Sequence, residues 1–191
     1  MTRLFLDVET YSPGPKPTYD DRIIAIAYKQ EGGPVTVLKE WESDEKQILT
    51  RFLEEIKRID RLSIVGHNIL RFDLPLIINR ASAHSIAPTG DLMRLLLDPY
   101  PIDTIQAQLQ ANNFYFKGLG LAECAKRIGT ETRTCPGLEI QTRYEQGDYT
   151  AITEHITEDV LTTEKLYNHL SKETLPNGNK DKQITFHLRG G

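Results

Sequence analysis

The chain has 191 residues, of which 39% are hydrophobic and 26% charged, and its formal net charge is −4. This length suits one α/β domain, because a core of this size buries roughly 70% of the unfolded surface. The longest apolar runs fall well short of the roughly 20 residues of a membrane-spanning helix, so we expect no membrane partner. The negative charge argues against a nonspecific coat of polyanion, and a bound nucleic acid must therefore be held by local contacts.

The two cysteines, Cys124 and Cys135, are too few for a zinc site or a disulfide scaffold. We interpret them as thiols of a reducing cytoplasm, although a single disulfide between them is an open alternative. The first residues enter a strand at once, so we expect no signal peptide and a cytoplasmic location.

Three strand-like segments open the chain, at residues 4–10, 22–28 and 34–38. A proline-rich loop, residues 12–17, separates the first two, and a short glycine turn separates the second and third. This order predicts an antiparallel meander.

A helix capped by Ser43 follows, and residues 62–66 then read as a buried strand. The pattern predicts another helix over residues 73–85 and a fifth strand over residues 86–92. The apolar residues that recur at helical spacing after Ser43 are Ile48, Leu49, Phe52, Leu53 and Ile56.

The second half of the chain is predicted to be helical, over residues 102–112, 121–128, 138–144 and 149–170. Asp148 is the candidate cap of the last and longest helix. We expect residues 1–173 to form the domain and residues 174–191, which are polar, to form a tail that is mobile or lies in a subunit contact.

Asp7 and Glu9 lie two residues apart in the first strand, so both carboxylates project from the same face. Burying two like charges together costs several kcal/mol, roughly, unless a cation compensates them. A strand that ends at a solvated edge explains the pair equally well.

Asp73 stands where a helix begins, after a buried strand that ends at Gly66. Open α/β sheets place their ligand sites at the ends of such strands. Asn68 offers a donor and an acceptor, and Phe72 offers an aromatic face for a base or sugar. An acid at a helix start is often a simple cap, and taken alone Asp73 favours that interpretation.

His155 precedes Asp159 by four residues on the last helix, so the two side chains share one face of it. They can face one site together. The alternative is a solvated helix face, since several glutamates crowd the same helix.

These segments together resemble the three exonuclease motifs of the DEDD superfamily of 3′ to 5′ exonucleases: Leu6-Asp7-Val8-Glu9-Thr10, then Gly66-His67-Asn68 with Phe72-Asp73, then a late helix with His155 and Asp159. The resemblance covers about residues 3 to 170. It is nearest to the proofreading domains of family B DNA polymerases and their stand-alone relatives, because two linking segments are also similar to segments there: Arg22-Ile23-Ile24-Ala25-Ile26-Ala27 and Gly118-Leu119-Gly120-Leu121. It implies a ribonuclease H-like α/β fold: a five-stranded mixed sheet, made of an antiparallel meander plus parallel strands, flanked by helices.

The third motif departs from the family pattern. One branch of the superfamily has Tyr four positions before the final Asp, and the other has His five positions before it. This chain has His155 at four and Glu154 at five. A four-residue step returns to nearly the same side of a helix, so His155 is the predicted member of the site.

The resemblance implies that Asp7, Glu9, Asp73 and Asp159 bind two Mg²⁺ or Mn²⁺ ions. His155 would orient or deprotonate the attacking water, and its ordinary pKa leaves it mostly neutral at working pH.

The resemblance further implies that the substrate is nucleic acid, most simply single-stranded DNA, cut from its 3′ end to nucleoside 5′-monophosphates. Thr10, Asn68 and Phe72 are the candidates for holding the terminal nucleotide.

Other readings stay open: trimming of RNA 3′ ends, a catalytically silent nucleic-acid-binding module of the same fold, and service to a replication or repair partner. Self-assembly into a homo-oligomer could lengthen the binding path. The segment 114–117, Phe-Tyr-Phe-Lys, could stack bases but more often such clusters pack a core, so it stays outside the predicted site.

Overall fold

The computed structural model describes residues 1–12, 14, 17–130 and 139–173. Within these ranges the strands form one five-stranded sheet in the order β3-β2-β1-β4-β5. The first three strands are antiparallel neighbours, and β4 and β5 run parallel to β1. The predicted mixed sheet with its antiparallel meander is thus confirmed. The strands are β1 (Thr2–Tyr11), β2 (Arg22–Gln30), β3 (Val35–Lys39), β4 (Leu62–Gly66) and β5 (Ile102–Asp103).

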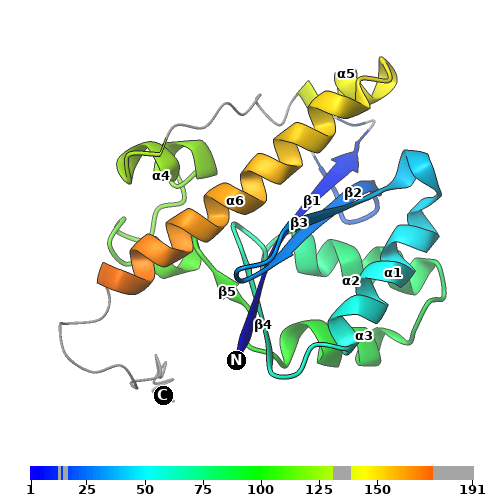
Figure 1. Cartoon of the computed structure of the whole chain (residues 1–191), viewed down its shortest axis with the longest axis horizontal. Helices are drawn as coiled ribbons and strands as arrows, with labels where there is room; N and C mark the ends of the chain where they lie inside the picture. Colours follow the sequence, from blue (N-terminus) through cyan, green and yellow to red (C-terminus); the bar gives the residue numbers. More distant parts are fainter. Residues whose placement is uncertain (13, 15–16, 131–138, 174–191) are drawn as a thin grey trace.

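Helices cover both faces of this sheet. The long helix α6 lies diagonally across one face, and α1, α2 and α3 lie on the other side (Figure 1). None of the described helices is both long and apolar enough to cross a lipid bilayer. The helices are α1 (Glu45–Lys57), α2 (Asp73–Ala83), α3 (Thr89–Leu97), α4 (Leu121–Arg127), α5 (Ile140–Glu145) and α6 (Tyr149–Glu173), with 3-10 turns η1 (Glu40–Glu42) and η2 (Gln106–Gln108).

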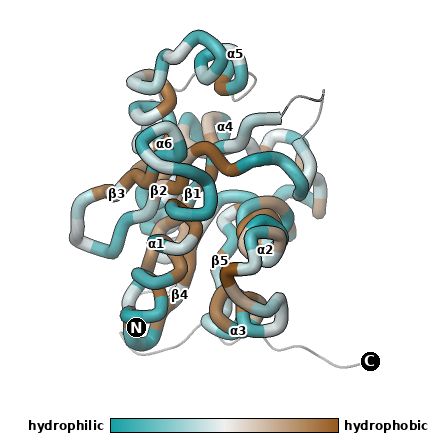
Figure 2. The backbone as a smooth tube through the Cα atoms, turned by 90° about the vertical axis from the view of Figure 1, so that its right-hand side faces the viewer, coloured by the Kyte–Doolittle hydropathy of each residue, from teal (hydrophilic) through white to brown (hydrophobic). Residues whose placement is uncertain are grey.

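The alternation of side chains along the strands divides the core into two main layers. The larger layer joins the even-numbered side chains of β1 to the apolar faces of α1, α2 and α3. The smaller layer joins Phe5 to Ile156 and Val160 of α6. Figure 2, in which hydrophobic residues are brown, shows these residues concentrated along the sheet and in the adjoining parts of α2 and α3.

Polar contacts fix α6 on its face of the sheet. Lys29 of β2 is buried and its Nζ lies 2.7 Å from Glu164 Oε1. At the start of β1, Arg3 Nε donates a 2.7 Å hydrogen bond to the hydroxyl of Tyr167. Ala151 N donates to Asp148 Oδ1, so the predicted cap of this helix is confirmed.

Two predicted elements are wrong. Residues 86–92, expected as the fifth strand, lead into α3, because Leu92 and Leu96 are buried one turn apart and continue a helical period beyond the expected strand. Residues 102–112, expected as a helix, begin with β5 and continue as η2 and turns. The cap of α1 is also not Ser43 but Asp44, whose Oδ1 accepts from the amide of Gln47 at 2.8 Å.

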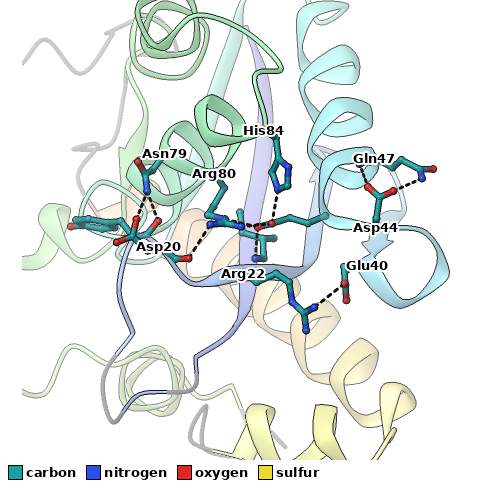
Figure 3. Close-up of polar contacts among 11 residues, drawn as sticks. Asp20, Arg22, Glu40, Asp44, Gln47, Asn79, Arg80 and His84 are labelled. Carbon is teal, nitrogen blue, oxygen red and sulfur yellow. Dashed lines mark hydrogen bonds and ion pairs between the residues drawn. The ribbon is translucent and has the colours of Figure 1, made fainter.

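A buried carboxylate ties α1 to α2 and β2 (Figure 3). Glu45 has 5% of its side chain exposed and accepts from Arg80 Nε at 2.8 Å, Arg80 Nη2 at 2.6 Å, His84 Nε2 at 2.7 Å and the amide of Ile23 at 2.8 Å. Arg80 also donates to the carbonyl oxygen of Asp20 at 3.0 Å. Burial alone would raise the pKa of Glu45, but these hydrogen bonds hold it below its ordinary value.

We predict that Glu45→Gln lowers the free energy of unfolding at pH 7 by about 2–4 kcal/mol, because Arg80 loses its buried partner. Since the folded-state pKa of Glu45 is lowered, the deficit is complete above the ordinary carboxylate pKa and shrinks as the pH falls through the folded-state value. Urea unfolding at pH 7 and pH 3.5 measures both effects. An equal deficit at the two pH values would contradict this account, and Glu54→Gln, an exposed change on the same helix, is the control.

Candidate active site

Asp7 and Glu9 project from β1 toward α6. They share the odd-numbered face of β1 with Phe5, whose ring packs against Ile156 and Val160 of α6. The predicted common face is therefore confirmed. The pairing with β2 shifts register between Glu9 and Thr10, a β-bulge of the kind that re-aims side chains beside functional sites.

These two carboxylates lie beyond the end of the neighbouring parallel strand. Strand β1 pairs with β4 only over Thr2–Phe5, and β4 ends at Gly66, while β1 continues to Tyr11. The loop that follows β4 leads to Asp73 at the first position of α2, and the backbone of Val8, which lies between Asp7 and Glu9, hydrogen-bonds to its carboxylate.

The loop after β4 is tightly constrained. A Cβ at Gly66 would lie 2.7 Å from Ile69 Cβ, a distance that real side chains do not show, so only glycine fits there without a shift. Asn68 has a positive φ of 67°, a conformation that asparagine tolerates better than most residues. Phe72 is the N-cap residue of α2 and makes no side-chain cap hydrogen bond, so Asp73 stands at the first helical position and not at the cap itself.

Sequence reasoning missed Asp103, the residue that holds this loop in place. Asp103 is 3% exposed, and its Oδ1 accepts from the amides of Asn68 at 3.1 Å and Ile105 at 2.8 Å. Its Oδ2 accepts from the amide of Leu70 at 3.1 Å. One carboxylate thus joins the loops that follow β4 and β5. Asp103 follows a single apolar residue, Ile102, in a segment predicted to be helical, so the sequence pattern did not indicate a structural role for it.

His67 makes a second connection that the sequence did not reveal. Its Nε2 donates a 2.8 Å hydrogen bond to the carbonyl oxygen of Leu119, and its Nδ1 lies 2.8 Å from the hydroxyl of Thr104. Burial lowers the pKa of His67. This imidazole therefore serves as a neutral link between the loop after β4 and the segment that precedes α4.

Helix α6 completes the cluster. His155 Nε2 lies 3.2 Å from Glu9 Oε1 and 3.7 Å from Asp159 Oδ2, and His155 is buried. Glu154, the neighbouring residue of α6, is exposed. The structure therefore puts His155 rather than Glu154 beside the carboxylates, as the four-residue spacing predicts.

The acids act on one another's ionisation. Burial raises the pKa of Asp7 well above its ordinary value, and the negative charges of Asp73, Asp159 and Glu9 add to this rise. Burial, with the charges of Glu9 and Asp103, raises the pKa of Asp73 to about 7. Burial raises the pKa of Asp159 to about 6, although His155 opposes the rise. Carboxylates far apart in the sequence therefore share one electrostatic environment.

The pKa of His155 is also raised, but by attraction to the carboxylates and not by burial. Burial by itself lowers the pKa of this imidazole, but the hydrogen bond and charge of Glu9, with the charges of Asp159 and Glu158, hold it above its ordinary value. In the protein without metal ions these carboxylates therefore favour the protonated imidazole, while the neutral imidazole expected at working pH stays a prediction.

The donor set suits hard divalent cations, which prefer carboxylate oxygens. Asp159 Oδ1 is buried and has no hydrogen-bond partner within the described ranges, so one oxygen of the cluster lacks compensation. In the same ranges, no three His, Cys, Asp or Glu side chains stand close enough to form a ready-made metal-binding group. The fit to cations therefore rests on the chemistry and charge of the acids rather than on a closed ligand cage.

The three predicted substrate-binding residues are close in sequence to the acids of the cluster. Thr10 follows Glu9 beyond the bulge, and Asn68 lies in the loop held by Asp103. Phe72 is half-buried, packs on the larger core layer and has its ring centroid 6.4 Å from that of Tyr19. Their roles toward a substrate stay predictions.

Comparison with known proteins now bears on this geometry. The family model of the RNase H superfamily matches residues 4–171. The chain belongs to the RNase H superfamily. This match covers most of the chain and includes each of the acids described above.

The relatives of this RNase H-superfamily chain are DNA polymerases. DNA polymerase 2 of Aeropyrum pernix is 38% identical over 79 residues, 39% of this chain and 10% of that protein. The DNA polymerase delta catalytic subunit of Plasmodium falciparum is 49% identical over 55 residues, 29% of this chain and 5% of that protein. This chain thus spans a small part of the polymerases it matches.

A solved structure shows the same fold. The family B DNA polymerase from Pyrobaculum calidifontis superposes with a TM-score of 0.73 over 89% of this chain and 24% of the polymerase, at 22% sequence identity. The predicted relationship to family B DNA polymerases and the predicted RNase H-like fold are both confirmed.

We predict that Asp73→Asn stabilises the metal-free protein at pH 8, raising its Tm by roughly 2–6 °C, because one of several repelling charges is removed. The raised pKa means that wild type loses stability as the pH rises through about 7, so the advantage shrinks below that pH. Differential scanning fluorimetry in chelator measures this. Adding Mn²⁺ should raise the Tm of wild type more than that of the variant.

Asp60→Asn, a change at an exposed acid, is the matched control and should leave both responses unchanged. A variant that is less stable than wild type in chelator at pH 8, with an undiminished response to Mn²⁺, would contradict the idea of a repelling, cation-binding cluster.

Proposed function

We propose that this chain is a metal-dependent 3′ to 5′ exonuclease that hydrolyses terminal phosphodiester bonds of single-stranded DNA and releases nucleoside 5′-monophosphates. The observation that carries the proposal is the convergence of Asp7, Glu9, Asp73 and Asp159 with His155 beside the central strand β1 of an RNase H-like sheet. The relatives named as DNA polymerases favour DNA over RNA.

In this proposal the four acids provide oxygen ligands for two Mg²⁺ or Mn²⁺ ions. When bound, such ions polarise the scissile phosphate and supply a water of lowered pKa. Asp7 would be one of these ligands, and the negative charges of the other three acids all act on its carboxyl group. Asp73 and Asp159 flank it from α2 and α6.

His155 holds or removes the proton of the attacking water at Nε2, the atom that faces Glu9 and Asp159. The attraction of those carboxylates raises its pKa in the metal-free protein. Cations bound to these carboxylates would remove most of this attraction, and the imidazole of His155 would then be able to accept a proton.

Asn68 and Phe72 grip the terminal nucleotide, with Thr10 near its sugar. The backbone of Asn68 is fixed by Asp103, so its carboxamide projects from a rigid position. Phe72 packs against the core on one side, which leaves the rest of its half-buried ring for a base or sugar. A splayed terminus is needed to reach this loop, which favours single strands over duplexes. A replication or repair partner and self-assembly are further proposals.

The direct test is hydrolysis of 5′-labelled single-stranded DNA, duplex DNA and RNA with Mg²⁺, Mn²⁺ or chelator. We expect a ladder that shortens from the 3′ end of single-stranded DNA and disappears in chelator. Asp7→Ala should lower the rate by roughly a thousandfold, since several kcal/mol of charge stabilisation are lost. A preference for RNA would make this chain an RNA-trimming enzyme, and no metal-dependent product in any lane would favour the silent module.

A second test separates the imidazole from the metal ligands. We predict that His155→Ala lowers kcat about a hundredfold or more while the rise in Tm with Mn²⁺ persists, because the four carboxylates remain. Glu154→Ala, a change at the adjacent exposed residue of α6, is the control and should keep full activity. Full activity of the His155 variant from about pH 6 to pH 9, the range that brackets such a base, would refute its role.

A further inference from the structure

Three consecutive aromatic side chains stand in solvent on the segment between η2 and α4. Phe114, Tyr115 and Phe116 are 72%, 70% and 42% exposed. We refer to residues 113–117 as the aromatic turn. A contribution to the core, the usual role of such a cluster, is wrong for these side chains. Contiguous exposed aromatic side chains on a folded domain mark a surface that binds a ligand or a partner.

The backbone of the aromatic turn is shaped by hydrogen bonds and not by burial of the rings. Asn113 and Phe114 both have positive φ, 51° and 62°, a conformation that costs energy in residues other than glycine. The amide of Phe114 donates to the carbonyl oxygen of Leu109 at 2.7 Å. Asn112 Nδ2 donates to the carbonyl oxygens of Tyr115 and Lys117. The turn is thus closed on itself and holds its rings outward.

The aromatic turn is attached to the loop that delivers Asp73. The guanidinium of Arg71 lies 4.5 Å from the centroid of the Phe116 ring. The hydroxyl of Tyr19 donates to the carbonyl oxygen of Arg71 at 2.7 Å, and His67 donates to Leu119 just after the turn. Arg71 precedes Asp73 by two residues, so their Cα atoms are at most about 7.6 Å apart. The turn therefore begins next to the carboxylate cluster.

The local charge differs from that of the whole chain. The segments 67–72 and 104–120 contain no Asp or Glu but include Arg71 and Lys117, both exposed, although the net charge of the protein is −4. Exposed rings interleaved with cations, without nearby acids on the same segments, match the requirements for stacking bases and pairing phosphates of a single strand.

We propose that the aromatic turn and Arg71 form a stacking platform for the nucleotides that lie upstream of the 3′ terminus of a single strand. The inference rests on the proposed exonuclease function, which puts the terminal nucleotide at the acids and Phe72. The next bases then stack on Phe114 and Tyr115, while Arg71 and Lys117 meet the backbone phosphates. The platform gives a preference for strands of several nucleotides without a preference for sequence, because every base has a stacking face.

The test is binding of fluorescein-labelled oligothymidylates by anisotropy, in chelator and again with Ca²⁺, at low salt. The variant Phe114→Leu/Tyr115→Leu keeps apolar side chains but removes the stacking faces. We expect it to bind a twelve-nucleotide strand roughly tenfold more weakly than wild type, with little change for a three-nucleotide strand. Both proteins should have the same Tm, since the rings are exposed.

The matched control is Tyr100→Leu. Tyr100 is 83% exposed and has a positive φ of 52°, like the residues of the turn, but it stands beside Leu62 at the opposite end of β4. It should bind both strands as wild type does. Three results would overturn the proposed platform. They are an equal loss of affinity in this control, unchanged binding by the turn variant, and no binding of the longer strand by wild type under either condition. The last result would point to a protein as the partner of the turn.

This experiment separates the two proposals because it needs no hydrolysis. If wild type cuts no substrate and the turn variant binds long strands more weakly than wild type, the proposed platform is supported and the proposed exonuclease activity is refuted. If wild type is active and the turn variant binds long strands with the same affinity, the exonuclease activity is supported and the platform is refuted.

Discussion

The unequal length of two neighbouring parallel strands is the constraint on which the site depends. Strand β4 stops at Gly66, while β1 continues and carries Asp7 and Glu9 past the point where it has a parallel neighbour. The loop after β4 leads to Asp73, and Asp103 holds its amides in place. Helix α6, packed diagonally on the same face, then brings His155 and Asp159 over the two strand acids.

This arrangement places like charges together beside a well-packed core, which opposes folding in the absence of cations. The raised pKa values of Asp7, Asp73 and Asp159 are the signature of that conflict. The surrounding structure withstands it because the larger core layer and the Glu45 network hold α1 and α2 against the sheet independently of the acids. A local arrangement that weakens the fold, kept within a fold that is otherwise consistent, is what physical reasoning expects of a functional site.

Much of this could be predicted from the sequence, where strict periodicity determines geometry. The two-residue spacing of Asp7 and Glu9 and the four-residue spacing of His155 and Asp159 each specify a shared face, and the structure keeps both. Prediction failed where tertiary pairing overrides local pattern. Residues 102–103 become a strand through two positions paired with β4, a contact too short to leave a periodic signal. The role of Asp103 follows from that pairing, so it could not be predicted without it.

The position of α6 near the end of the described chain has a consequence for synthesis on the ribosome. The strands, α1 and α2 all precede residue 110, so most of the larger core layer can form before α6 emerges. Until then, Asp7, Glu9 and Asp73 lack the histidine and the aspartate that this helix contributes. The emerging polypeptide therefore carries only part of the candidate active site. The site is completed when α6, the last described helix, packs on the sheet.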